Sequence, residues 1–257
     1  MTPVMHHDDV ALNEAVFELV SDIQAVSFLD KGTGHAHWRI QTPTQTLLWR
    51  QSLTTLGAPG SRPDRELQVL EAIAGQPWAP RLIANVPNAG MLLPFYDGVH
   101  PTPKTLISAP TRSALLGHVS SLWEMPCHIE PYDYEALVHS YLTRTPEPAR
   151  WQPLADRLIE QAQWPTDTFR LTHHDLHADN LLLYKDRWMI LDWEYAGLAN
   201  PWVDAVMLDR MMTLSAVEKD QLEAVLPDIG MEHPWQGMHE WLDGLDELWH
   251  AAWMNKE

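Results

Sequence analysis

The chain has 257 residues, in which 17 Lys and Arg stand against 35 Asp and Glu, for a formal net charge of −18 at pH 7. This excess of acid argues against nucleic acid or an anionic membrane surface as the partner, because both bind clustered basic side chains. The single cysteine, Cys127, excludes an internal disulfide framework and a cysteine-based zinc cluster.

Membrane and export signals are not evident in the sequence. No apolar run reaches the length of a membrane span, and residues 1–9 lack the basic region and apolar core of a secretory signal. We therefore expect a cytoplasmic protein without a membrane partner. The oligomeric state stays open at this point.

The N-terminal part is predicted to mix helix and strand. Apolar side chains recur near helical spacing over residues 10–24, which predicts an amphipathic helix. Residues 29–34 are typical of a turn-rich loop. Residues 37–40 and 46–50 then flank a turn at residues 41–45, which predicts two strands.

A second helix is expected to follow these strands. Residues 61–64 have a capping-box pattern that predicts its start, and Gly75 marks its end. Further strands are expected over residues 80–83 and 90–96. Gly and Pro then interrupt the pattern over residues 97–103, which indicates a linker.

The remainder of the chain is predicted to be mostly helical. From about residue 110 the pattern is helical to the end, with residues 181–192 as the exception. A small α+β part thus precedes a larger helical part. We expect two lobes of one catalytic unit, residues 1–97 and 98–257, with a ligand in the cleft between them.

Residues 181–192 are predicted to form a β-hairpin with polar groups at its open end. Two short apolar strands within residues 181–191 are joined by a three-residue loop, residues 185–187. If the hairpin is centred on Asp186, Asn180 and Asp192 lie opposite each other. An amide oxygen and a carboxylate in this arrangement can share one Mg²⁺ ion, which prefers oxygen ligands.

A further carboxylate precedes the hairpin. Asp175 lies five residues before Asn180, in the loop that leads into the first strand. It could orient a hydroxyl group and accept its proton. One acid beside a pair of metal-binding residues suits phosphoryl transfer, because catalysis of that reaction is mainly positioning and charge neutralisation.

These residues also form a pattern that resembles a known family. His173, Asp175 and Asn180 match the His-x-Asp-x-x-x-x-Asn catalytic loop of protein-kinase-like enzymes. The sequences HHDLHADN at residues 173–180 and ILDWEYAG at residues 190–197 resemble the small-molecule branch: aminoglycoside phosphotransferases and the choline, ethanolamine and thiamine kinases. The resemblance implies an α+β, protein-kinase-like fold with a small antiparallel-sheet lobe, a larger helical lobe, and ATP and Mg²⁺ as cofactors.

The resemblance also implies roles within this segment. Asp175 would be the catalytic residue, and Asn180 and Asp192 would hold the Mg²⁺ ion. His177 lies where this branch commonly has a His, and it is a candidate for contact with the substrate. Asp204 matches a family Asp that ties down the catalytic loop. We interpret His173 as packing that loop rather than touching substrate.

The nucleotide would be held by the N-terminal part. No lysine lies on the strand where protein kinases carry one, and Arg50 occupies that place. Arg presents a planar fork that suits phosphate. Glu66, in the following helix, would be its ion-pair partner. Gly32 and Gly34 lie where the phosphate-covering loop belongs, although two such glycines are also common in ordinary turns.

The base would meet the segment between the lobes. Residues 91–98 resemble the family hinge, whose backbone would contact adenine near Leu93 and Phe95. Pro94 lacks an N–H group and can offer only its carbonyl.

The molecule that accepts the phosphoryl group is expected to be a cation. The C-terminal part is acidic and rich in Trp, and ring faces bind quaternary ammonium groups. Trp193 and Trp241 are candidate acceptor contacts, and Glu194 could add a carboxylate. Trp241 and its neighbours also fall at helical spacing, so a place in the core is the alternative.

The sequence therefore predicts a small-molecule kinase. It would transfer the γ-phosphate of ATP to a hydroxyl of a small cationic amino alcohol of the choline, ethanolamine or thiamine type. An aminoglycoside or amino-sugar phosphotransferase and a nucleotide-binding pseudoenzyme are the alternatives. A zinc site in the His and Asp run is disfavoured because no third ligand is apparent. The choice between ATP and GTP stays open.

Overall fold

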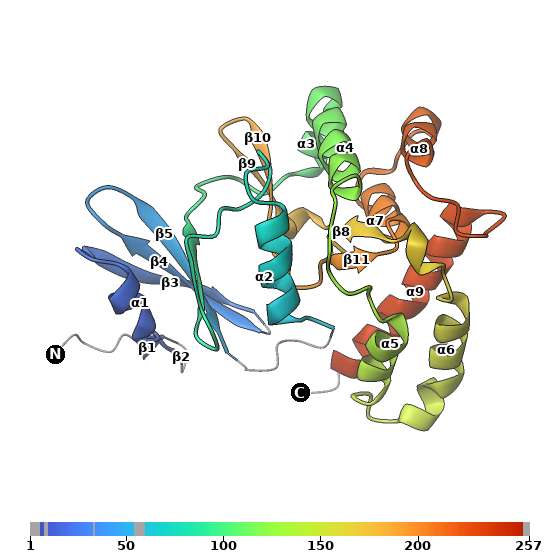
Figure 1. Cartoon of the computed structure of the whole chain (residues 1–257), viewed down its shortest axis with the longest axis horizontal. Coiled ribbons are helices and arrows are strands. Elements are labelled where there is room, and N and C mark those ends of the chain that lie inside the picture. The colour runs from blue at the N-terminus through green and yellow to red at the C-terminus, as the bar shows by residue number, and fades with distance from the viewer. Residues whose placement is uncertain (1–5, 8–9, 33, 54–59, 254–257) are drawn as a thin grey trace.

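The computed structural model describes residues 6–7, 10–32, 34–53 and 60–253. Its N-terminal lobe is a five-stranded antiparallel sheet in the order β3-β4-β5-β7-β6 (Figure 1). The elements of this lobe are β1 (His6–His7), β2 (Val10–Ala11), α1 (Ala15–Leu19), β3 (Ala25–Lys31), β4 (His35–Gln41), β5 (Thr46–Ser52), α2 (Pro63–Ala72), β6 (Ala84–Val86) and β7 (Gly90–Pro94).

The two faces of this sheet have different chemistry. Alternate residues of β4 and β5 are buried on one face, where Trp38 and Trp49 pack with Val16 of α1. Since successive side chains of a strand point to opposite faces, the intervening residues share the other face. Among them are His37 of β4 and Arg50 of β5, which lie directly opposite each other. The polar face is thus available for a ligand.

The C-terminal lobe is mostly helical, with two small two-stranded sheets near the N-terminal lobe (Figure 1). Its helices are α3 (Pro103–Leu106), α4 (Ala109–Trp123), α5 (Tyr134–Leu142), α6 (Pro148–Gln161), α7 (Trp202–Met212), α8 (Ala216–Glu223) and α9 (Pro234–Trp253). Its strands are β8 (Arg170–Thr172), β9 (Leu181–Tyr184), β10 (Arg187–Ile190) and β11 (Gly197–Ala199).

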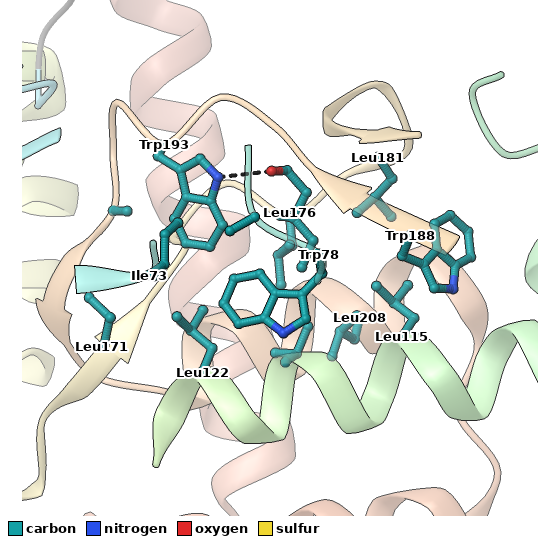
Figure 2. Close-up of a cluster of buried hydrophobic side chains, with 14 of the residues drawn as sticks. Ile73, Trp78, Leu115, Leu122, Leu171, Leu176, Leu181, Trp188, Trp193 and Leu208 are labelled. Carbon is teal, nitrogen blue, oxygen red and sulfur yellow. Dashed lines mark hydrogen bonds between the residues drawn. The ribbon is translucent and has the colours of Figure 1, made fainter. Parts of the chain in front are cut away.

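Tryptophans form the centre of the larger cores. Trp78, Trp188 and Trp193 pack with Leu115 and Leu122 of α4, and this cluster joins the two lobes (Figure 2). A second cluster fills the space between α5, α6, α7 and α9. The high Trp content is therefore largely a property of the cores.

The hairpin turn differs from the sequence prediction. Arg187 pairs with Tyr184, so the turn contains only Lys185 and Asp186. Both have positive φ, 51° and 60°, as a type I′ turn requires. The shorter turn moves the register by one residue. Leu191, whose N–H donates to the carbonyl of Asn180 at 2.8 Å, therefore occupies the place predicted for Asp192.

Three N-terminal predictions are wrong in part. The helix expected over residues 10–24 is only α1, because the chain leaves it at Val20 and turns at Asp22, whose φ is 56°. The loop expected at residues 29–34 begins later, because residues 29–31 complete β3 along the sheet edge. The capping box at residues 61–64 is absent: Arg62 is the N-cap, and its side chain does not cap the helix.

The remaining strand predictions are partly confirmed. The strand expected at residues 80–83 begins four residues later as β6, whereas β7 falls within the predicted range 90–96. Strands β8 and β11 were not predicted. They have three residues each, which is too short for a period-2 pattern to be visible.

Within the described residues, none of the helices combines the length and apolar character that crossing a membrane requires.

An ion pair fastens the helices of the C-terminal lobe together. Arg112 of α4 contacts both carboxylate oxygens of Glu218 in α8, one of them at 2.9 Å, and also donates to the carbonyl of Met212 at 2.8 Å. The hydrogen bond from Arg112 lowers the pKa of Glu218 to about 2. This stabilisation is fully present above the ordinary pKa of 4.5 and is lost as the pH falls through about 2.

We therefore expect Glu218→Gln to lower the free energy of unfolding by about 1–2 kcal/mol at pH 7. Gln can still complete the capping box with Ser215, so the loss reports the charge. Urea unfolding at a series of pH values should show the difference from wild type shrinking as the pH falls from 4.5 to about 2. Glu135→Gln, with a side chain 63% exposed, is the matched control. A difference that did not depend on pH would contradict this assignment.

Candidate active site

The loop between β8 and β9 is held by a buried carboxylate. Strand β8 pairs with β11, and α7 follows directly, which brings Asp204 beneath this loop. Asp204 accepts the backbone N–H of His173 at 2.9 Å and of His174 at 2.8 Å, and the indole N–H of Trp123 at 3.2 Å. Burial raises the pKa of Asp204, while these donors act to lower it. Three donors on one carboxylate fix the start of the loop.

His173 connects this loop to the segment after the hairpin. It is fully buried, and its Nε2 donates to the carbonyl of Leu191 at 2.7 Å. Its Nδ1 lies 3.3 Å from the backbone N–H of Asp175 and accepts from it. The ring thus positions two segments and lines neither of the two cavities described below.

Asp175 and Asn180 are in direct contact. The Nδ2 of Asn180 donates to the carbonyl and to Oδ2 of Asp175, each at 2.9 Å. Because the amide nitrogen is used in this way, the amide oxygen of Asn180 is the atom left for another ligand. His177 Nε2 lies 3.5 Å from Oδ2 of Asp175, and this carboxylate raises the pKa of His177.

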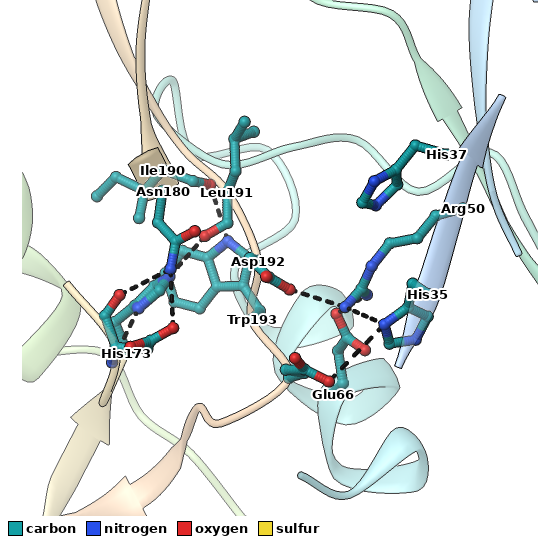
Figure 3. Close-up of polar contacts among 12 residues, drawn as sticks. His35, His37, Arg50, Glu66, His173, Asn180, Ile190, Leu191, Asp192 and Trp193 are labelled. Carbon is teal, nitrogen blue, oxygen red and sulfur yellow. Dashed lines mark hydrogen bonds and ion pairs between the residues drawn. The ribbon is translucent and has the colours of Figure 1, made fainter. Parts of the chain in front are cut away.

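A buried arginine joins the two lobes at this point (Figure 3). Arg50 of β5 contacts Glu66 of α2, and its other nitrogen donates to Oδ1 of Asp192 at 2.7 Å. Burial acts to lower the pKa of Arg50, but the two carboxylates raise it, so the guanidinium stays charged. Asp192 has a φ of 57°, a left-handed conformation that Asp tolerates better than most residues.

The neighbours of Arg50 include an uncharged histidine and a buried acid. Arg50 donates to Nδ1 of His35 at 3.1 Å, so this nitrogen carries no proton. Burial, and to a smaller extent the charge of Arg50, lowers the pKa of His35 to about 3. Burial and the nearby Asp192 raise the pKa of Glu194 to about 7. Oε2 of Glu194 has no hydrogen-bond partner among the described residues. It lies 3.8 Å from Nδ1 of His35.

One cavity lies between the sheet and the hairpin. This sheet-side cavity has a volume of about 400 Å³. Its lining includes Leu29, Asp30, His37, Leu48, Arg50, Glu66, Leu93, Phe95, Asn180 and Asp192. It therefore brings together most of the residues that the sequence assigns to the nucleotide and the metal. The backbone N–H of Phe95 already donates to the carbonyl of Thr46 at 3.0 Å, so it is not free to bind a base.

Two predicted residues lie beside this cavity rather than on it. Gly32 and Gly34 occupy the turn between β3 and β4, and neither is among the lining residues. The N–H of Gly32 donates to the carbonyl of His35 at 2.8 Å. Thr33, between the two glycines, lies outside the described residues, as does most of the N-terminal segment 1–9.

A second cavity lies among the helices. This helix-side cavity has a volume of about 470 Å³. Its aromatic lining residues are Tyr132, Tyr141, Tyr195 and Trp249, and its carboxylate residues are Asp175, Asp192, Glu194 and Asp246. Asp192 lines both cavities, so they meet at this residue. Among the described residues that line the helix-side cavity there is neither a lysine nor an arginine.

The two Trp candidates for this cavity are placed elsewhere. Trp241 is fully buried, donates to the carbonyl of Leu158 at 3.0 Å and does not line the cavity, so the prediction that it contacts the acceptor is wrong. Trp193 stacks on Trp78 with ring centroids 5.8 Å apart and borders the sheet-side cavity instead. The tryptophan on the helix-side cavity is Trp249, two turns further along α9.

Sequence reasoning missed the aromatic wall of this cavity. Tyr132, which lines the cavity, stacks on His174 with ring centroids 4.6 Å apart, and the hydroxyl of the buried Tyr134, which is not a lining residue, lies 2.7 Å from His174 Nε2. Burial lowers the pKa of His174 to about 3, so this ring is neutral. His174 has a φ of 70°, which the three bonds to Asp204 stabilise. The doubled His of the loop was visible in the sequence, but nothing there indicated the two tyrosines.

Comparison with known proteins identifies the family of this chain. Residues 25–229 match the family described as "Phosphotransferase enzyme family". No curated protein matches the sequence.

Solved structures show the same fold at low identity. The choline kinase LicA from Streptococcus pneumoniae has a TM-score of 0.73 at 13% identity, over 93% of this chain and 88% of that chain. A choline/ethanolamine kinase family protein from Mesorhizobium loti has a TM-score of 0.64 at 17% identity, over 94% and 85%. A spectinomycin phosphotransferase in complex with ADP and spectinomycin has a TM-score of 0.65 at 14% identity, over 93% and 86%.

The kinase-like fold predicted from the sequence is thus confirmed, as is the resemblance to small-molecule kinases. The family match covers well over half of the chain. The chain therefore belongs to the phosphotransferase enzyme family, whose members are ATP-dependent kinases that phosphorylate hydroxyl groups of small molecules.

Proposed function

We propose that the protein transfers the γ-phosphate of ATP to the hydroxyl of a small cationic amino alcohol of the choline, ethanolamine or thiamine type. The observation that carries this proposal is the helix-side cavity, which aromatic rings and carboxylates line and which has neither lysine nor arginine among its described lining residues. Ring faces and carboxylates both attract ammonium groups. The protein from Streptococcus pneumoniae that shares the fold is a choline kinase.

Asp175 is the residue that acts on the acceptor in this proposal. It lines the helix-side cavity, and its side chain is about one third exposed. The hydrogen bond from Asn180 fixes the direction of its carboxylate. The other oxygen can accept a hydrogen bond from the acceptor hydroxyl and then its proton. His177 and Glu194 lie at the same cavity and would contact the acceptor.

Asn180 and Asp192 fit a magnesium ion. The free amide oxygen of Asn180 and the carboxylate of Asp192 are oxygen donors on one cavity, as Mg²⁺ prefers. When bound, Mg²⁺ supplies charge neutralisation at the phosphates. Arg50 donates to one carboxylate oxygen of Asp192, Oδ1, at 2.7 Å.

The sheet-side cavity would hold the nucleotide. Arg50, supported by Glu66, faces the phosphates, and the apolar end with Leu93 and Phe95 receives the base. Gly32 and Gly34 would border the phosphates from the β3–β4 turn.

A second candidate function is phosphorylation of an aminoglycoside or amino sugar. The four carboxylates of the helix-side cavity also suit a polycation, and a spectinomycin phosphotransferase shares the fold. The aromatic rings favour the amino alcohol, because ring faces bind quaternary ammonium groups such as that of choline. The two functions use the same catalytic residues and differ only in the acceptor.

The first experiment is a measurement of ADP release from Mg-ATP with choline, ethanolamine, thiamine, kanamycin, an amino sugar or no acceptor. We expect one of the amino alcohols to stimulate release, because its ammonium group matches the helix-side cavity. Stimulation by kanamycin or the amino sugar alone would support the second candidate. ATP binding without turnover on any acceptor would contradict both and favour a pseudoenzyme.

Asp175→Asn is the control for this assay. Asn still accepts the hydrogen bond from Asn180 but cannot take up the hydroxyl proton. Turnover should fall by about 10²–10⁴-fold, while the affinity for ATP stays unchanged.

Asp192→Asn tests the magnesium assignment. Asn tolerates the left-handed backbone of this position, whereas Ala would add strain. Removing the charged ligand should abolish the gain in ATP affinity on addition of Mg²⁺ and lower turnover by roughly a thousandfold. Nucleotide titrations with and without Mg²⁺ measure the first effect directly.

Asp186→Asn in the hairpin turn is the matched control, because its φ of 60° is similar and it lies outside both cavities. It should leave the Mg²⁺ dependence intact. An Asp192→Asn variant whose affinity still rose with Mg²⁺ would show that the metal is held elsewhere.

A further inference from the structure

Three adjacent strands place a row of polar side chains across the sheet-side cavity. Asp30 of β3 lies opposite His37 of β4, and His37 lies opposite Arg50 of β5. All three line the cavity. The register of β3 shifts between Phe28 and Asp30, and this irregularity brings the carboxylate into line with the histidine.

The position of His37 relates it to one part of a nucleotide. On β5, Leu48 precedes Arg50 on the same face and belongs to the apolar end of the cavity, together with Leu93. Arg50 reaches Asp192 at the other end. Figure 3 shows the ring of His37 beside the Arg50 side chain. His37, which is paired with Arg50, is therefore level with the start of the Arg50 side chain and beyond the apolar end that Leu48 marks, whereas the guanidinium of Arg50 reaches on to Asp192.

Binding of phosphates in the sheet-side cavity calls for a basic group besides Arg50. Arg50 is the only arginine among the described lining residues, and two carboxylates already contact it. The other basic lining residues are His37 and His100. His100 lies in the segment that joins the lobes, where its Nδ1 contacts the carbonyl of Leu181 at 3.0 Å. His37 is thus the histidine that shares the sheet face with Arg50.

Asp30 fixes which nitrogen of His37 is available. An ionised carboxylate only accepts hydrogen bonds, so Nδ1 of His37 donates to Oδ1 of Asp30. This hydrogen bond lowers the pKa of Asp30, which keeps its carboxylate ionised. Nε2 is then the nitrogen left for a ligand. The side chain of His37 is 27% exposed, so it can be reached through the cavity.

From this geometry we propose that His37, oriented by Asp30, binds the phosphate nearest the ribose. The nitrogen Nε2 donates to an oxygen of this phosphate when it carries a proton. The groups around His37 are Asp30 on β3, His35 on the same strand, Arg50 on β5, and Asp192 after the hairpin. This inference rests on the proposed use of the sheet-side cavity for a nucleotide.

The test is a calorimetric titration of adenosine, AMP and ADP without Mg²⁺. We expect His37→Leu to weaken AMP and ADP by about tenfold each and to leave adenosine unchanged, because AMP and ADP share the first phosphate. Asp30→Leu should weaken the same two ligands by a smaller factor. Asp30→Asn should restore most of the affinity, since its amide oxygen still accepts from Nδ1.

His139→Leu on α5 is the matched control, because it removes an imidazole that is 48% exposed and lines neither cavity. It should change none of the three affinities. Equal losses for adenosine and AMP, or no loss for AMP, in a His37→Leu protein with a wild-type melting temperature would overturn the phosphate assignment. A wild-type protein that bound none of the three ligands would instead overturn the nucleotide assignment of the whole cavity.

Discussion

The two lobes depend on one buried guanidinium. Arg50 contacts Glu66 within the N-terminal lobe and Asp192 in the C-terminal lobe, so a single side chain links the sheet, α2 and the segment after the hairpin. A buried charge is stable only when it is paired and hydrogen-bonded. Neither lobe can therefore move far without leaving Arg50 or its carboxylates unpaired. The relative placement of the two cavities follows from this constraint.

The shape of the catalytic segment depends on a second buried charge. Asp204 holds the backbone of the loop at His173 and His174, and His173 in turn holds Leu191. The positive φ values of His174 and Asp192 are conformations that L-residues rarely adopt. They persist because the bonds on either side fix them. Asp175 and Asp192 thus receive their directions from buried residues that line neither cavity.

The sequence predicts the parts of the site that are local along the chain. The spacing of Asp175, Asn180 and Asp192 could be recognised because one loop and one hairpin carry all three. The register was missed by one residue, since the pattern does not distinguish a two-residue from a three-residue turn. The wall formed by Tyr132 and Trp249 could not be predicted, because segments more than a hundred residues apart meet only in the folded chain.

Charge distinguishes the two cavities that meet at Asp192. Each cavity is lined by four carboxylate residues, but the sheet-side cavity also carries Arg50, whereas neither lysine nor arginine is among the described residues that line the helix-side cavity. Arg50 gives a polyphosphate a cationic partner in the sheet-side cavity, whereas the carboxylates of the helix-side cavity face a small cation without a competing arginine among the described lining residues. In the proposed function, the reacting groups meet beside Asp192, with Asp175 on the acceptor side. The global charge of −18 is thus compatible with an anionic nucleotide, because the local distribution of charge decides where each substrate binds.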